Sequence, residues 1–94
     1  MAWCYLIHFD SPVRGKQRHY LGYTSNLPQR WGDHRAGHGA DLTKAAVRQG
    51  IGMTLARVWP DGTRSLEDKL KRISHFKSYC PICMGDAVSV ELTR

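Results

Sequence analysis

The sequence has no long hydrophobic run. Its apolar N-terminal stretch, MAWCYLIHFD, is interrupted by His8, and no segment reaches the roughly 20 apolar residues of a membrane-spanning helix. The stretch also lacks a basic leader, which argues against a signal peptide. The sequence has only three cysteines, and this odd number does not fit a disulfide framework. These absences predict a cytoplasmic protein with reduced thiols and no membrane partner.

Acidic residues are also few. Eight Asp and Glu stand against fourteen Lys and Arg, so the net charge is +6. An excess of this size in a small domain favours an anionic partner, most often nucleic acid, although a merely basic surface is the alternative. The 94 residues are enough for one domain with one modest core. We place this domain at residues 1–79, with residues 80–94 as a C-terminal tail.

Two aromatic, β-prone segments open the chain. The alternation in Trp3–Phe9 predicts a strand, and Arg18–Tyr23 predicts a second strand that pairs with it as a hairpin. Between them, DSPVRGK has the composition of a turn. We choose the register that sets Tyr5 opposite Tyr20, which brings both phenols to the same face of the sheet.

A helix follows the second strand. The triplet TSN supplies candidate caps, and proline is tolerated in a first helical turn, so a helix is predicted from about Leu27 to Ala36. Leu27 and Trp31 form its apolar stripe. Arg30 and His34, four residues apart, are predicted to line the edge of this stripe and to face a cleft.

The remaining segments complete an α/β pattern. DLTKAAVRQ predicts a short helix ended by a glycine, and GMTLARVW predicts a third strand. A longer helix is predicted from Thr63 or Ser65 to Tyr79, with Glu67 at the margin of its apolar face. That face is formed by Leu66, Leu70, Ile73 and Phe76. The predicted fold is therefore a small three-stranded antiparallel sheet flanked by helices.

The motifs CYL, YLG, TSNLPQRWGDH and SLEDKLKR together resemble the GIY-YIG nuclease family, and in particular its small single-domain members. The resemblance covers about residues 3–77 and implies this family's fold. It also implies a catalytic set, which consists of Tyr5, Tyr20, Arg30, His34 and Glu67. The first motif reads WCY, without the family's glycine and isoleucine, and the second has Leu21 in place of isoleucine. The asparagine that many members carry after the glutamate helix has no counterpart, because Asn26 is the only asparagine in the sequence.

The resemblance implies a divalent-metal-dependent endonuclease that cleaves phosphodiester bonds, with DNA favoured over RNA and no small-molecule cofactor. Glu67 offers a hard oxygen ligand for one Mg²⁺ or Mn²⁺ ion, and Arg30 can bind the phosphoryl oxygens. Tyr5 can act as a general base if nearby cations lower its pKa, while Tyr20 and His34 orient water or relay its proton. The alternative is a catalytically silent nucleic-acid-binding module with the same fold.

Basic residues gather in three segments, where they are candidates for sequence-independent contacts with phosphates. One segment is the hairpin loop, the second is the short helix and the third is the last helix. The candidates are Arg14, Lys16, Arg18, Lys44, Arg48, Lys71 and Lys77.

A C-x-x-C pair, Cys80 and Cys83, follows the last predicted helix, with His75 upstream and Cys4 elsewhere in the chain. A structural zinc site needs four ligands, commonly two such pairs, so Zn²⁺ is an alternative that the sequence does not favour. A redox pair is a weaker alternative, because no thioredoxin-like context surrounds it. The favoured interpretation is a turn at Pro81 that ends the helix and buries small side chains.

Overall fold

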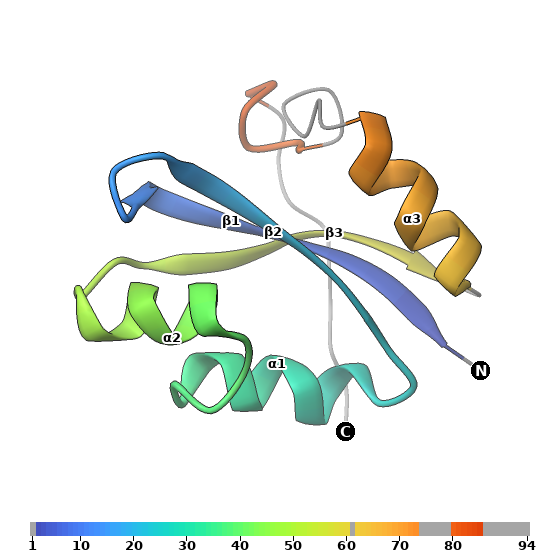
Figure 1. Ribbon diagram of the computed structural model, residues 1–94, viewed down its shortest axis with the longest axis horizontal. Coiled ribbons are helices and arrows are strands. Elements are labelled where there is room, and N and C mark those ends of the chain that lie inside the picture. The colour runs from blue at the N-terminus through green and yellow to red at the C-terminus, as the bar shows by residue number, and fades with distance from the viewer. Residues whose placement is uncertain (1, 61, 74–79, 86–94) are drawn as a thin grey trace.

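The computed structural model describes residues 2–60, 62–73 and 80–85. Its elements, in chain order, are β1 (Trp3–Val13), β2 (Gln17–Thr24), α1 (Leu27–Arg35), α2 (Asp41–Arg48), β3 (Met53–Pro60) and α3 (Arg64–Ile73) (Figure 1). The three strands form one antiparallel sheet in the order β2-β1-β3. The predicted α/β class and three-stranded antiparallel sheet are confirmed. Within the described residues, no helix combines the length and apolar character needed to cross a membrane.

The hairpin between β1 and β2 turns more tightly than the sequence predicted. Arg14 and Gly15 both have positive φ angles, 54° and 78°, and Lys16 N–H donates to the Val13 carbonyl at 3.2 Å. Three residues, Arg14, Gly15 and Lys16, join the two strands, and the positive φ angles of the first two make the turn tight. The predicted turn over DSPVRGK is therefore wrong in its first half. The chain stays extended there because Asp10 N–H donates to the Gly52 carbonyl at 2.9 Å and Val13 is fully buried.

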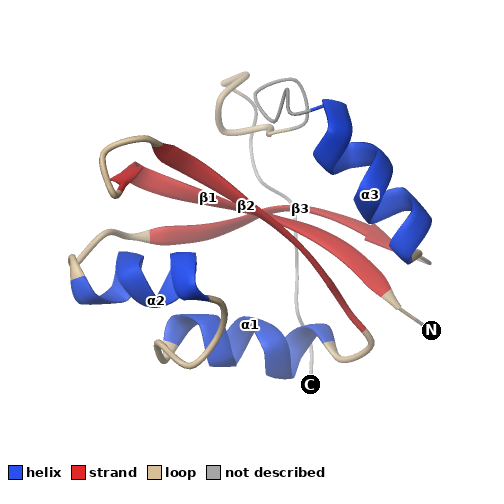
Figure 2. Cartoon of the chain, viewed as in Figure 1, coloured by secondary structure: helices blue, strands red, loops and turns tan. Residues whose placement is uncertain are grey.

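Helices cover both faces of the sheet, with α1 and α2 on one side and α3 and residues 80–85 on the other (Figure 2). Because successive side chains of a strand point to opposite faces, β1 contributes to two apolar clusters. Tyr5, Ile7 and Phe9 pack on the α1 and α2 side. Leu6 packs on the α3 side, in a cluster completed by Leu21, Ala56, Leu70 and Cys80. The two faces of β1 are thus buried in two separate apolar clusters.

Side-chain caps fix where α1 and α3 begin. The Asn26 side chain accepts from Gln29 N–H at 3.3 Å, which confirms the cap predicted from TSN. Thr63 plays the same part for α3, since its hydroxyl accepts from Leu66 N–H at 3.0 Å. The predicted start of this helix is confirmed, and its predicted continuation to Tyr79 falls on residues 74–79, which lie outside the described residues.

Candidate active site

The two tyrosines of the predicted site share one face of the sheet, but in a register different from the predicted one. Tyr5 lies opposite Gly22, and Tyr20 lies opposite Ile7. A Cβ atom at Gly22 would collide with the ring of Tyr5, so only glycine leaves room for this phenol. The error of two residues keeps the face unchanged, because the side-chain period of a strand is two. The two rings lie diagonally, with their centroids 6.3 Å apart.

His34 lies in the interior of the protein and not at the edge of a cleft, so that part of the prediction is wrong. Its side chain is 0% exposed, and its Nε2 atom lies 2.7 Å from the hydroxyl of Tyr5. The ring of Tyr20 packs edge-on against the imidazole, with centroids 5.2 Å apart. The strand pair and α1 therefore meet at a buried Tyr5–His34 hydrogen bond.

Thr43, on α2, completes this contact and was not singled out by the sequence analysis. Its Oγ1 lies 2.7 Å from Nδ1 of His34 and donates its own hydrogen to the Ala40 carbonyl at 3.0 Å. Since the hydroxyl hydrogen is used in this way, Nδ1–H of His34 must donate to Thr43. Nε2 is then the acceptor, and Tyr5 donates to it. Gly39 closes over the imidazole, because a Cβ there would collide with the ring.

The surroundings of His34 keep its imidazole neutral. Burial, together with the positive charge of Arg30, lowers its pKa from 6.5 to about 4. The neutral ring is the form required by the hydrogen bonds, in which Nε2 accepts. At neutral pH His34 is therefore a proton acceptor aimed at Tyr5.

Arg30, half-buried on α1, interacts with both phenols. Burial acts to lower its pKa, but hydrogen bonding to Tyr5 and Tyr20 outweighs this effect and raises it. Burial and the neighbouring Tyr20 raise the pKa of Tyr5, and Arg30 offsets this only in part. The sequence predicted that Tyr5 acts as a general base if nearby cations lower its pKa. The side chains around Tyr5 do not meet this condition, because its pKa is raised.

Glu67 lies in the first turn of α3, which is tied to the start of β1. The Cys4 thiol donates to the Thr63 carbonyl at 3.5 Å, and Gly62 N–H donates to the Ala2 carbonyl at 2.9 Å. The negative charge of Glu67 is the last of the causes that raise the pKa of Tyr5, and α3 lies on the other side of the sheet from α1 and α2. The Glu67 side chain is 14% exposed, and its carboxylate lies 3.7 Å from Nζ of Lys71.

The donor chemistry of Glu67 fits a hard divalent cation. A carboxylate oxygen is the ligand that Mg²⁺ prefers, and this ion usually keeps several waters and takes substrate phosphate as a further ligand. Among the residues the structure describes, Glu67 is not part of any group of three or more metal-ligating side chains. One carboxylate would therefore supply the protein's share of such a site.

The candidate phosphate-binding residues fall at several places on the surface. Arg14 of the hairpin turn and Lys44 and Arg48 of α2 line one hollow, together with Asp41. Lys16 and Arg18 are exposed near the turn, and Lys71 is exposed on α3. Lys77 lies outside the described residues. The structure thus brings a candidate from the hairpin loop next to the two candidates of the short helix.

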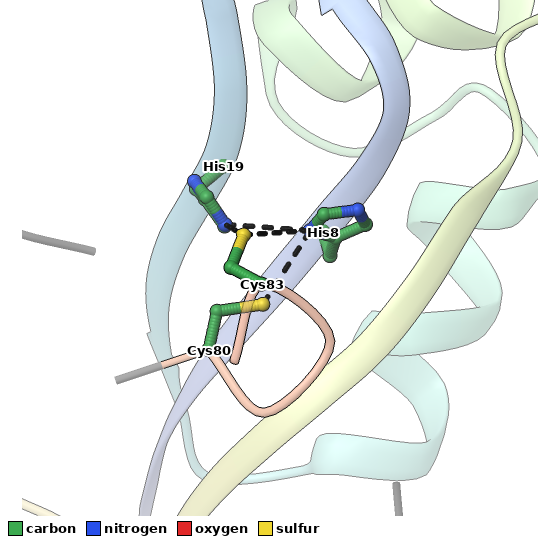
Figure 3. Close-up of side chains that lie close together, drawn as sticks. All are labelled: His8, His19, Cys80 and Cys83. Carbon is green, nitrogen blue, oxygen red and sulfur yellow. Dashed lines mark hydrogen bonds between the residues drawn. The ribbon is translucent and has the colours of Figure 1, made fainter. Parts of the chain in front are cut away.

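A second group of polar side chains occupies the opposite face of the sheet. His8 of β1, His19 of β2, Cys80 and Cys83 place one ligand atom each within 4.8 Å of one another (Figure 3). Cys80 is fully buried and 81–85 form a turn, as predicted, but Cys83 is exposed and does not pack inside. Two other residues were named with the C-x-x-C pair in the sequence. Cys4 contacts Thr63 instead, and His75 lies outside the described residues. The histidines were missed, although both lie on the predicted hairpin.

Comparison with known proteins identifies the family. The family model for the GIY-YIG catalytic domain matches residues 1–78 of the 94-residue chain. Neither curated proteins nor solved structures give a match. The chain belongs to the GIY-YIG family, which is a nuclease-type family.

Proposed function

We propose that this protein is a divalent-metal-dependent endonuclease that hydrolyses phosphodiester bonds in nucleic acid, with DNA as the favoured substrate. The observation that carries the proposal is the buried chain of hydrogen bonds from Tyr5 through His34 to Thr43, beside Arg30. Nε2 of the neutral His34 accepts the hydrogen bond from the Tyr5 hydroxyl, so a proton acceptor lies next to the phenol. The arrangement supports proton transfer at a site that also offers a cation for phosphate.

The hydrogen-bond directions define a route for the proton. Tyr5 donates to Nε2 of His34 and accepts from Arg30, which leaves one lone pair of its oxygen to accept a proton from the attacking water. Because burial raises the pKa of Tyr5, a free phenolate is disfavoured. In the proposed relay, Tyr5 takes the water's proton as its own proton passes to His34, and no phenolate forms.

Arg30 links substrate binding to this relay. Its guanidinium can fork onto two phosphoryl oxygens and stabilise the negative charge that develops on them. A bound phosphate also balances the positive charge of Arg30, which is one of the causes that lower the pKa of His34. Substrate would therefore make His34 a stronger base at the moment it is needed.

Glu67 would hold the divalent cation. When bound, such an ion supplies positive charge to the phosphoryl oxygens and acidifies a bound water. One observation favours the alternative of a silent binding module: the ammonium group of Lys71 lies 3.7 Å from the Glu67 carboxylate, where it competes with a cation. An endonuclease should lose cleavage in the Glu67→Gln variant, whereas a silent binding module should show no cleavage in either protein.

The test is a nicking assay on supercoiled plasmid, branched DNA and RNA, with Mg²⁺ or Mn²⁺. We expect wild type to cleave DNA and Glu67→Gln to lose about 10²-fold or more of this activity, since charge on the phosphoryl group is no longer neutralised. Binding should hold or rise, because one negative charge facing phosphate is removed.

Asp68→Asn is the matched control, since it removes an exposed carboxylate from the next position of the same helix. It should cleave like wild type. Equal cleavage by Glu67→Gln and wild type, or no divalent-dependent cleavage of any substrate, would make the silent module the better description. Preferential cleavage of RNA would overturn the assignment of DNA alone.

A further inference from the structure

We propose that His8, His19, Cys80 and Cys83 form a structural zinc site that fastens the segment after α3 to the β1–β2 hairpin. This site is separate from the divalent-cation site proposed at Glu67. It lies on the other face of the sheet from Tyr5, and its four ligands come from three places in the chain (Figure 3).

Four of the six distances between the ligand atoms match those of a tetrahedral ion site. Zn–N bonds of about 2.0–2.1 Å and Zn–S bonds of about 2.3 Å place two nitrogens about 3.3 Å apart and a nitrogen and a sulfur about 3.6 Å apart. Nδ1 of His8 lies 3.4 Å from Nε2 of His19 and 3.4 Å from Sγ of Cys80. Sγ of Cys83 lies 3.6 Å from Nδ1 of His8 and 3.3 Å from Nε2 of His19.

Hydrogen bonding alone does not account for this cluster. Nδ1 of His8 has three close neighbours: Nε2 of His19 and the sulfurs of Cys80 and Cys83. An imidazole nitrogen has either one hydrogen or one lone pair, so it satisfies one such contact and not three. A cation at the centre of the four atoms satisfies all of them at once.

The donor set selects zinc and a structural role. Two thiolates and two imidazoles in a tetrahedron are a common structural zinc site, and a C-x-x-C pair has the usual spacing. Four protein ligands fill the coordination shell, so no position remains for a catalytic water. The mutual separations, all within 4.8 Å, suit one ion.

The backbone holds the ligands in place before an ion arrives. His8 and His19 are directly opposite each other in the register of β1 and β2, so both side chains point to the same face. On the other side, Met84 N–H donates to the Cys80 carbonyl at 3.2 Å, and Gly85, with φ of 80°, closes the turn. Cys80 is itself fully buried in the cluster formed with Leu6, Leu21 and Leu70.

The ion would join parts of the chain that are far apart in sequence. Cys80 and His8 are separated by 72 residues, and the residues between them include all of α3. A crosslink of this length stabilises the fold by restricting the unfolded chain. Binding converts two thiols to thiolates, so one Zn²⁺ displaces two protons when both histidines are neutral.

The experiment measures zinc and stability, so it does not depend on nuclease activity. Protein purified without chelator should contain one Zn²⁺ per chain by elemental analysis. Titration of the metal-free chain with Zn²⁺ should release two protons per ion. Cobalt in place of zinc should give the strong visible absorption of a tetrahedral thiolate site. Removal of zinc should lower the melting temperature by roughly 10 °C or more.

Variants separate ligation from packing. Cys83→Ser should lose stoichiometric zinc, whereas Cys83→His, which keeps a ligand at this exposed position, should retain it. His38→Asn, at an exposed histidine outside the cluster, should bind zinc like wild type. Substoichiometric zinc in wild type after refolding with Zn²⁺, a melting temperature unchanged by its removal, or a Cys80–Cys83 disulfide in freshly purified protein would each overturn the proposal.

Discussion

The hydroxyl of Tyr5 donates to Nε2 of His34 across 2.7 Å, which joins the central strand of the sheet to the helix that follows the hairpin. Both side chains are buried, at 1% and 0% exposure. A buried polar atom without a hydrogen-bond partner is costly, so both ring nitrogens of His34 need one. Tyr5 is the partner of Nε2, and Thr43 is the partner of Nδ1. Tyr5, His34 and Thr43 are therefore one connected unit.

The role of Thr43 is testable with a nearly isosteric change. Thr43→Val removes the acceptor for Nδ1–H of His34, so we expect the ring to shift toward the Nε2–H tautomer, which no longer accepts from Tyr5. Cleavage should fall by about tenfold or more, and stability by about 1–3 kcal/mol because the buried Nδ1 atom is left without a hydrogen-bond partner. The measurements are nicking rate and urea unfolding. Thr43→Ser keeps the hydroxyl and should preserve the rate; similar rates for Val and Ser would contradict the relay.

The lowered pKa of His34 predicts a pH dependence of stability. The pKa is about 4 in the folded protein and 6.5 without the fold's influence, so the unfolded chain binds more protons between these values. Stability from the neutral ring is fully present above about pH 6.5 and is lost as the pH falls toward 4, on the order of 2 kcal/mol.

Urea unfolding measured across this pH range checks the sign and size. His34→Gln should flatten the dependence between pH 6.5 and 4, whereas His38→Gln, at an exposed position, should not. A wild-type stability that rises as the pH falls through this range would show that His34 is protonated in the fold.

Gly22 is expected to be required for the position of Tyr5. Gly22→Ala places a methyl group where the ring of Tyr5 lies, so the phenol must move away from His34. We expect cleavage to fall by at least about tenfold, together with a loss of about 1–3 kcal/mol of stability from overpacking. Leu21→Ala, on the other face of β2, should cost at least as much stability, about 2–5 kcal/mol, without displacing Tyr5. Full activity of Gly22→Ala at a temperature where both variants are folded would refute this role.

The hollow formed by the hairpin turn and α2 is expected to bind phosphates. Replacing Lys44 and Arg48 together with Gln should weaken DNA binding and reduce the salt dependence of affinity by about 0.9 in log–log slope for each lost phosphate contact. Melting temperature should change little, since both side chains are exposed. Lys69→Gln with Arg72→Gln removes the same charge from exposed positions of α3 and is the control. Equal losses in both pairs would indicate general electrostatic attraction with no preferred surface.

Much of the fold could be predicted from local sequence because its signals act over a few residues. The β-prone residues of Trp3–Phe9 form β1, which is buried on both faces, and the Asn26 cap starts α1. The turn was placed too broadly because Asp10 and Pro12 have turn-like composition. A backbone hydrogen bond to Gly52, from a segment more than forty residues away, keeps that stretch extended.

By itself the sequence determined the elements, the basic charge and the five site residues that resemble the family, since these follow from short-range patterns and residue types. Only the tertiary structure decided the register that sets Tyr5 against Gly22, and the burial of His34 under α2. It also brought His8 and His19 to Cys80 and Cys83. These relationships depend on shape and hydrogen bonds between residues distant in the chain, and no local pattern specifies which of many distant partners a side chain will contact.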